Sequence, residues 1–257
     1  MFDPKQLLDQ FLGGQGGNAQ RNDQRSASPW DDQRGNDPRG QGGGGVMGRV
    51  GDYARNNPLL AGGVAGGLAG LLLGKGFGKD IVKYGGMAVI GGLAYKAYRD
   101  YQASQQNPGH APAYAPGGYG AADFAPPPPD SLFAPANAPM QLAETLIVAM
   151  IAAAKSDGHI DAEERGRIYQ RLEEGGLQPE EIAFLQRELT EPVDLDRIVA
   201  GAVNKEAAVE IYAASVMAIR KDTPQEQAYL DSLATRLKLE PGLVQSIETT
   251  VEAIALK

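Results

Sequence analysis

The sequence has 257 residues, 42% of them hydrophobic, and a formal net charge of −8. The negative charge argues against broad nucleic-acid binding. The absence of cysteine excludes disulfides, thiolate metal sites and a catalytic cysteine. Most of the 34 glycines and 17 prolines precede residue 140, so only the carboxy-terminal part has the composition of a dense core. We expect no secretory signal peptide, because residues 1–12 lack an apolar run.

Residues 1–12 have the periodicity of a short amphipathic helix, and Pro4 suits its first turn. A contact with lipid or a partner and a helix without a dedicated role are both open interpretations. Residues 13–57, rich in Gly, Gln, Asn and Arg, are predicted to be a disordered linker.

Residues 58–101 are apolar and rich in glycine, and are predicted to form a helical pair in a membrane. Glycines at every fourth position allow helices to approach closely, and here they are Gly62, Gly66, Gly70, Gly74 and Gly78. In a soluble helix each would cost about 1 kcal/mol relative to alanine. The uncharged run Leu59–Leu73 is shorter than the ~20 residues of a full span. A membrane hairpin, a single span with a re-entrant partner and a soluble self-associating pair therefore remain open.

Residues 102–139, rich in Pro, Ala and Gly, are predicted to be an extended, polyproline-like linker. From Met140 to Lys257 the helical period dominates, and prolines and caps mark the helix starts. Seven helices are predicted, at 140–155, 161–174, from Pro179, at 195–202, at 207–219, from Pro224 with Thr223 as N-cap and Glu226 at the third position, and from Pro241. The predicted fold class is all-α, with a compact bundle following the membrane hairpin and linkers.

The stretch from Ile151 to Arg165 combines a tight turn with several acidic residues. Gly158 suits the positive φ of such a turn, and Asp161 with Glu164 would cap the following helix. A faint repeat at a spacing of 62 residues would bring a second capped turn, at Thr223, close to the first. Oxygen ligands of this kind suit a hard divalent cation, above all Ca²⁺. The candidate ligands are Asp157, Asp161, Glu164, Asp222 and Glu226, and helix capping alone is the competing interpretation.

These motifs resemble a known family. The pattern Asp-Gly-x-Ile-Asp-x-x-Glu at 157–164, followed by 212–219 and by Asp-Thr-Pro-x-Glu at 222–226, resembles the tellurite-resistance TerB-like domain. The glycine-rich region upstream resembles the YebE-like inner-membrane proteins that carry this domain. The resemblance implies an all-helical fold, metal-binding acidic turns and the bacterial inner membrane. We expect the helical domain on the cytoplasmic side, although positive charges on every side of the apolar region cancel the usual orientation signal. Arg220 and Lys221 depart from the family, which commonly has an acidic residue there.

No nucleophile–base pair, phosphate-binding loop or paired-acid site stands out, and we predict no enzymatic activity. The leading hypothesis is a membrane-anchored interaction or sensor protein that binds a divalent cation and acts in envelope or metal stress, the stress context being implied by the resemblance alone. The expected partners are the membrane and either another protein or a second copy packed against the glycine-rich helices. A soluble self-associating scaffold without metal is the alternative, and a hydrolase using Asp161 or Glu164 is a third possibility.

Overall fold

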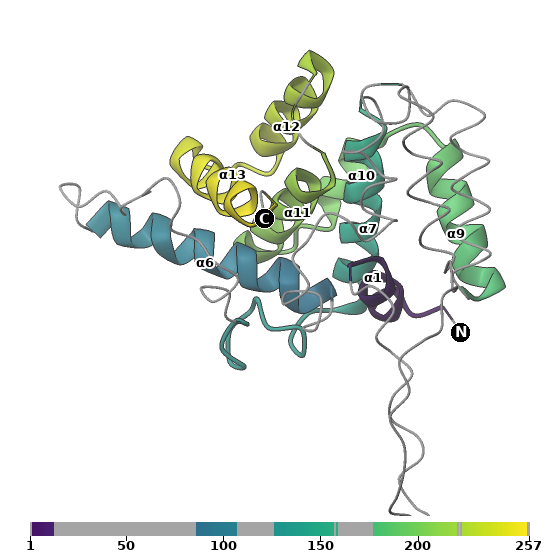
Figure 1. Cartoon of the computed structure of the whole chain (residues 1–257), viewed down its shortest axis with the longest axis horizontal. Coiled ribbons are helices and arrows are strands. Elements are labelled where there is room, and N and C mark those ends of the chain that lie inside the picture. Colours follow the sequence, from purple (N-terminus) through teal and green to yellow (C-terminus); the bar gives the residue numbers. More distant parts are fainter. Residues whose placement is uncertain are drawn as a thin grey trace, which may run out of the picture. The chain divides into compact units, whose positions relative to one another are not determined.

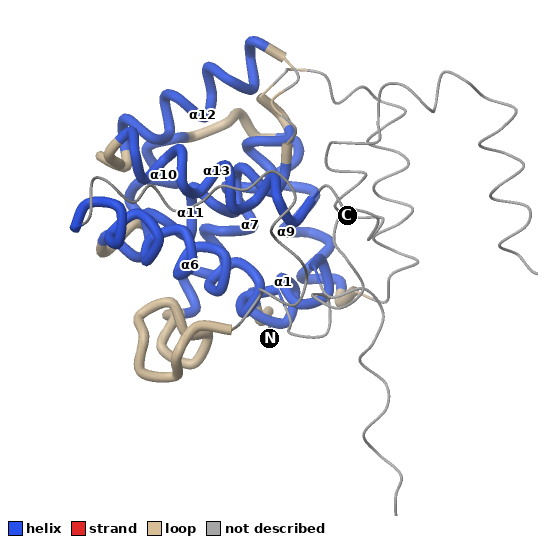
Figure 2. The backbone as a smooth tube through the Cα atoms, turned by 60° about the vertical axis from the view of Figure 1, so that its left-hand side comes forward, coloured by secondary structure: helices blue, strands red, loops and turns tan. Residues whose placement is uncertain are grey.

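Helices make up all the regular secondary structure that is described. The computed structural model describes residues 2–12, 86–106, 126–156, 158, 177–219, 221 and 223–255. These residues form eight helices and no strand, which confirms the predicted all-α class (Figures 1 and 2). The helices are α1 (Pro4–Leu12), α6 (Gly86–Gln106), α7 (Met140–Ala154), α9 (Pro179–Thr190), α10 (Leu195–Ala200), α11 (Lys205–Ala218), α12 (Pro224–Arg236) and α13 (Pro241–Ala255).

The hydrophobic core is built around α7 and α11, which pack against each other (Figure 1). Every residue of α11 from Ala207 to Ala218 is buried, as expected for a helix that is apolar nearly all round. Asn204 starts this helix by accepting a hydrogen bond from the backbone N–H of Ala207 at 2.7 Å. The inward face predicted for α7 is confirmed, because Leu142, Leu146, Met150 and Ala153 are at most 3% exposed.

Local capping chemistry positions the helix starts as predicted. Pro179, Pro224 and Pro241 are each the first residue of a helix, where the missing N–H is no loss and φ is already suitable. Thr223 and Glu226 form the expected capping box: the N–H of Glu226 donates to Thr223 Oγ1 at 3.2 Å, and the N–H of Thr223 donates to Glu226 Oε2 at 2.9 Å. The helix predicted at 161–174 lies outside the described residues.

Two helices that precede residue 140 contribute to the same core. Leu7 and Leu8 of α1, and Ile90 and Leu93 of α6, are at most 1% exposed. Helix α6 packs against α1, α11 and α13. The sequence predicted a separate amphipathic helix for α1 and a membrane hairpin that included most of α6, whereas other helices of the chain cover the apolar part of α6. No helix in the described ranges combines the length and apolar character needed to cross a membrane. The stripe from Gly62 to Gly78 lies outside those ranges.

Residues 126–139 form turns against α6 instead of the extended linker that was expected (Figure 2). Three successive turns are each closed by a backbone hydrogen bond of 2.9–3.0 Å. The side-chain amide of Asn137 also donates to the carbonyl of Pro129 at 2.9 Å. The Phe133 ring is buried, with its centroid 5.9 Å from the Tyr95 ring and 5.7 Å from the Tyr98 ring. Burial of this aromatic side chain holds the segment on α6.

Candidate functional site

An open groove of about 560 Å³ lies between the carboxy-terminal half of α7 and the connection from α9 to α10. We call it the α7–α10 groove. Its floor is provided by Val148, Ile151 and Ala152 of α7, which are apolar but only 2–8% exposed. Pro192, Val193 and Leu195 extend the apolar lining, and the charged lining residues are Lys155, Glu188, Glu191, Asp194, Asp196, Arg197 and Arg236. The groove therefore combines an apolar floor with a charged rim.

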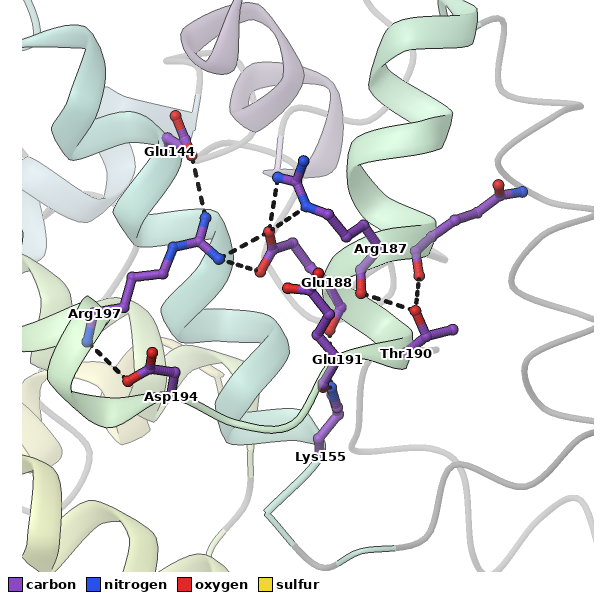
Figure 3. A network of polar contacts seen from close by, with 9 residues as sticks. Glu144, Lys155, Arg187, Glu188, Thr190, Glu191, Asp194 and Arg197 are labelled. Carbon is purple, nitrogen blue, oxygen red and sulfur yellow. Dashed lines mark hydrogen bonds and ion pairs between the residues drawn. The ribbon is translucent and has the colours of Figure 1, made fainter.

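Glu188, in the last turn of α9, is the centre of the rim (Figure 3). Its side chain is 5% exposed, and a buried carboxylate is costly unless it is paired. Arg197 Nη1 donates to both Glu188 oxygens, at 3.0 and 2.9 Å, and Arg187 Nη2 donates to Oε1 at 3.0 Å. Arg197 Nη2 also reaches Glu144 of α7 at 3.3 Å. The network thus joins α7, α9 and α10 through one buried charge.

Arg197 connects this network to the start of α10. Its backbone N–H donates to the N-cap residue Asp194 at 3.0 Å, while its guanidinium binds Glu188. Burial lowers the pKa of Arg197, but hydrogen bonds and charge interactions with Glu188 and Glu144 outweigh this effect and raise it overall. The guanidinium therefore stays charged and binds Glu188 while the backbone of the same residue is fixed by the helix cap.

Lys155, just beyond the end of α7, binds the end of α9 across the groove. Its Nζ donates to the carbonyl oxygen of Glu188 at 2.8 Å and to that of Glu191. Carbonyl groups in the last turn of a helix lack intrahelical partners and carry partial negative charge, so a cation is favourable there. Burial lowers the pKa of Lys155, and the charges of Glu188 and Glu191 oppose that effect. Lys155 therefore fixes the edge of the groove.

Glu226 is the one predicted cation ligand that falls within the described residues. Its Oε2 accepts hydrogen bonds from the N–H of Thr223 at 2.9 Å and from Thr223 Oγ1 at 3.1 Å. The carboxylate thus performs the predicted capping role. Among the residues with described positions, no group of three acidic or histidine side chains could hold a metal ion. The other predicted ligands, Asp157, Asp161, Glu164 and Asp222, lie outside that part of the chain.

Gly158 and Lys221 each lie beside one of the two acidic turns, and both are described in the structure. Gly158 has φ of 77°, which confirms the expected positive φ. Lys221, which departs from the TerB-like pattern, also has a positive φ, of 58°. Its Nζ lies 2.7 Å from Glu248 Oε2 of α13, and Glu248 Oε1 accepts a hydrogen bond from Tyr212 at 2.8 Å. The Lys221 charge is therefore paired with a partly buried carboxylate of α13.

Cation binding stays a prediction that melting curves of the full chain with and without Ca²⁺, Mg²⁺ or Zn²⁺ would test. An ion that binds only the folded state, and is present at a hundred times its dissociation constant, adds about 2.7 kcal/mol to the free energy of unfolding. A shift with one ion that disappears in the Asp157→Asn/Asp161→Asn variant would support a site. If no ion shifts the melting temperature, capping is sufficient to explain the acidic residues.

Residues 58–251 match the family described as "Protein of unknown function (DUF533)". The chain belongs to the DUF533 family. The match to DUF533 includes α6, α7 and the whole groove, and it begins after α1. A relative from Yersinia enterocolitica, "Uncharacterized protein in ampR 5'region", is 32% identical over 111 residues, which cover 43% of this chain and 80% of that protein. No solved structure matches significantly. Membership of DUF533 therefore brings no activity with it, and a function has to be argued from the residues.

No local pattern in the sequence predicts the α7–α10 groove. Glu188 and Arg197 are nine residues apart and lie on different helices, and the third member, Glu144, lies 53 residues from Arg197. The available signal was a charged residue at a position of the apolar period: Glu188 follows the inward-facing Leu185 by three residues, and it is itself buried. A buried charge at such a position indicates a partner, but periodicity does not say which residue provides it.

Proposed function

We propose that this DUF533 protein is a non-enzymatic interaction protein that binds a segment of a partner protein in the α7–α10 groove. The observation that supports this proposal is the chemistry of the groove. Its exposed apolar residues are Pro192 and Val193, beside the nearly buried floor, while several of its charged groups are already bound, among them Arg236 to Asp196 and Lys155 to backbone carbonyls. Charged groups that already have partners within the protein hold the shape of the surface. Apolar residues surrounded by a polar rim are the usual composition of a protein-binding site.

The partner segment that fits best carries an apolar side chain as anchor, with polar groups on either side. Pro192 and Val193 would provide most of the contact with the anchor, because the floor residues are nearly buried already, and a few such contacts provide most of the binding energy in protein interfaces. Val193, at 39% exposed, lies beside this floor and would lose its solvent contact on binding. The exposed acidic residues Glu191 and Asp196 would contact the polar groups that flank the anchor and set the orientation of the segment.

A photocrosslinking residue placed at Val193 of the full chain tests this proposal in cells. The matched control is the same residue at Gln245, which is exposed on α13, away from the groove lining. We expect a discrete protein adduct at position 193 only, reproduced with the purified partner and reduced by Arg236→Glu. Identical adducts at both positions, or none at 193, would refute binding in the groove.

We further propose that residues 58–85 tether the protein to the bacterial inner membrane, with the helical bundle on the cytoplasmic side. The support is the uncharged run Leu59–Leu73 with its regular glycines, together with the YebE-like resemblance. Because α6 packs in the bundle, the tether would be confined to residues before Gly86. A TerB-like form of residues 140–257 and a role in envelope or metal stress belong to the same proposal and rest on resemblance.

The burial of α6 also favours a second candidate, a soluble scaffold that self-associates. The apolar face of α6 is already covered by other helices of the same chain. Part of the region that was predicted to lie in the membrane therefore needs no lipid to cover it. Alkaline carbonate extraction of membranes separates the two candidates. Retention of the full chain in the membrane pellet supports the tether, and release into the supernatant would leave the scaffold.

A further inference from the structure

The turns of residues 126–139, which we call the strap, lie on α6 (Figure 2). The buried Phe133 ring packs against the rings of Tyr95 and Tyr98 of that helix. The backbone carbonyl of Phe133 lies against Gly91, because a Cβ at that glycine would be 2.2 Å from the carbonyl oxygen. The strap therefore comes this close to α6 only because position 91 carries no side chain.

Glu210 of α11 reaches the same point. Its side chain is buried, and its Oε1 would lie 3.2 Å from the same Cβ of Gly91. Neither carboxyl oxygen has a hydrogen-bond partner within the described structure. No hydrogen bond between described residues ends at the Phe133 carbonyl either. Two acceptor oxygens thus meet in a buried place where no described group donates to them.

A protonated carboxyl group suits this place, whereas a carboxylate does not. The O–H of a protonated glutamic acid can donate to a carbonyl oxygen. A carboxylate would instead face another acceptor and lose its hydration without compensation. Burial, with a smaller contribution from the charge of Glu206, raises the pKa of Glu210 to about 8, in agreement with the geometry.

Ionisation would leave the charge of Glu210 without a counter-ion among the described residues. On α6, Lys96 and Arg99 lie 2.8 and 3.6 Å from Asp100, and Lys205 of α11 lies 3.0 Å from Glu240. Arg236, the one basic residue of α12, is bound to Asp196. The other titratable groups on the elements around Glu210 are acids or phenols: Tyr95, Tyr98, Tyr101, Asp130, Glu144, Glu206, Tyr212, Glu226, Tyr229, Asp231, Glu248 and Glu252.

The strap is the element that can move to let water reach an ionised Glu210. Its three turns are closed by hydrogen bonds within the strap itself, so it can leave α6 as a folded unit. Helix α11 is buried along almost its whole length, and α6 packs on α1, α11 and α13. An open pocket of about 360 Å³, lined by residues of α6 and of the strap and by Glu206, brings solvent within one helical turn of Glu210.

We propose that Glu210 is a pH-sensitive latch for the strap: its proton keeps the Phe133 carbonyl seated at Gly91, and loss of that proton as the pH rises releases the strap from α6. Release exposes Tyr95 and Tyr98 and gives α6 an aromatic surface. The closed form has the raised pKa and the open, hydrated form approaches the ordinary pKa of 4.5. The preference for the closed form is therefore complete below pH 4.5 and is lost as the pH rises to about 8. The latch does not depend on the function proposed for the α7–α10 groove.

Because the chain contains no cysteine, a thiol introduced at Ala134 of the strap, which is 3% exposed, reports opening through its rate of alkylation. Ala134→Cys is placed in the full chain and in a full chain that also carries Glu210→Gln, and both are labelled between pH 6 and pH 9. Dividing the first rate by the second removes the dependence of thiol reactivity on pH. We expect this ratio to rise at least about tenfold from pH 6 to pH 8, because each pH unit between the two pKa values favours the open form by up to about tenfold.

Two controls separate opening of the strap from other effects. Leu132→Cys, at a strap residue that is 55% exposed, should be labelled at the same rate with and without Glu210→Gln at every pH. Hydrogen exchange of residues 126–139 in the native chain and in Glu210→Gln repeats the comparison without an introduced thiol, and it decides the outcome if Ala134→Cys itself loosens the strap. A ratio that stays constant with pH in both measurements would overturn the latch. Faster labelling and exchange in Glu210→Gln than in the native chain at pH 6 would overturn it too, because glutamine keeps a donor for the Phe133 carbonyl.

Discussion

Replacement of Glu210 by glutamine should make this protein more stable at neutral and alkaline pH. Glu210 lies on α11 and is 1% exposed, and neither carboxyl oxygen has a hydrogen-bond partner within the described structure. Gly91 makes room beside it: a Cβ there would lie 3.2 Å from Glu210 Oε1 and 2.2 Å from the carbonyl oxygen of Phe133. Burial, with a smaller contribution from the charge of Glu206, raises the pKa of Glu210 to about 8.

The size of the effect follows from the difference between the folded and unfolded chains. The unfolded carboxyl ionises near its ordinary pKa of 4.5, whereas the folded one holds its proton to about 8. The folded state is therefore favoured fully below pH 4.5, and this contribution is lost as pH rises towards 8. The difference between the two pKa values corresponds to at most about 5 kcal/mol of folding stability, of which about 3 kcal/mol is lost by pH 7. Glutamine does not ionise in this range, so Glu210→Gln removes this dependence of the folding stability on pH.

Urea unfolding followed by circular dichroism at pH 5, 7 and 9 measures the effect in the full chain. The stability of Glu210→Gln relative to the native chain should increase with pH, by a few kcal/mol between pH 5 and pH 9. Glu252→Gln, on the exposed side of α13, should follow the native chain. Parallel pH profiles for the native chain and Glu210→Gln would refute the reasoning, because Glu210 would then have to be hydrated or paired.

Three further substitutions test the packing and capping through the urea midpoint at pH 7. Arg197→Ala leaves buried Glu188 with a single guanidinium and should cost about 2–4 kcal/mol. Gly91→Ala forces a methyl group against the Phe133 carbonyl and should cost about 1–3 kcal/mol, despite the higher helix propensity of alanine. Thr223→Ala removes the cap of α12 and should cost about 1 kcal/mol.

Matched variants separate these effects from general changes in charge or helix propensity. Arg99→Ala removes a side chain that is 61% exposed and 3.6 Å from Asp100, and should cost under about 0.5 kcal/mol. Gly242→Ala meets the edge of the Tyr101 ring at 3.0 Å instead of backbone, and should cost less than Gly91→Ala. Equal losses of stability for Arg197→Ala and Arg99→Ala would contradict the network around Glu188. Equal losses for Gly91→Ala and Gly242→Ala would contradict the close packing at Gly91.

Local chemistry explains why most helices of the carboxy-terminal part could be predicted. Pro179, Pro224 and Pro241 begin helices because proline suits only the first turn, and the Thr223 box depends on residues three positions apart. The inward face of α7 follows from the helical period of its apolar residues. These properties depend on neighbours within one or two turns, so the sequence alone contains the information.

The partners of each apolar or charged surface were decided only by the tertiary structure. The sequence showed that α1 and α6 have apolar residues to bury, but protein and lipid are equally compatible with such a pattern. Only the folded chain places Leu8 against Gly86, across the stretch 13–85, and Arg197 against Glu188 in the rim of the groove. Periodicity specifies which face of a helix is buried, whereas the contacts that cover it join residues far apart in the chain and depend on the packing of the whole bundle.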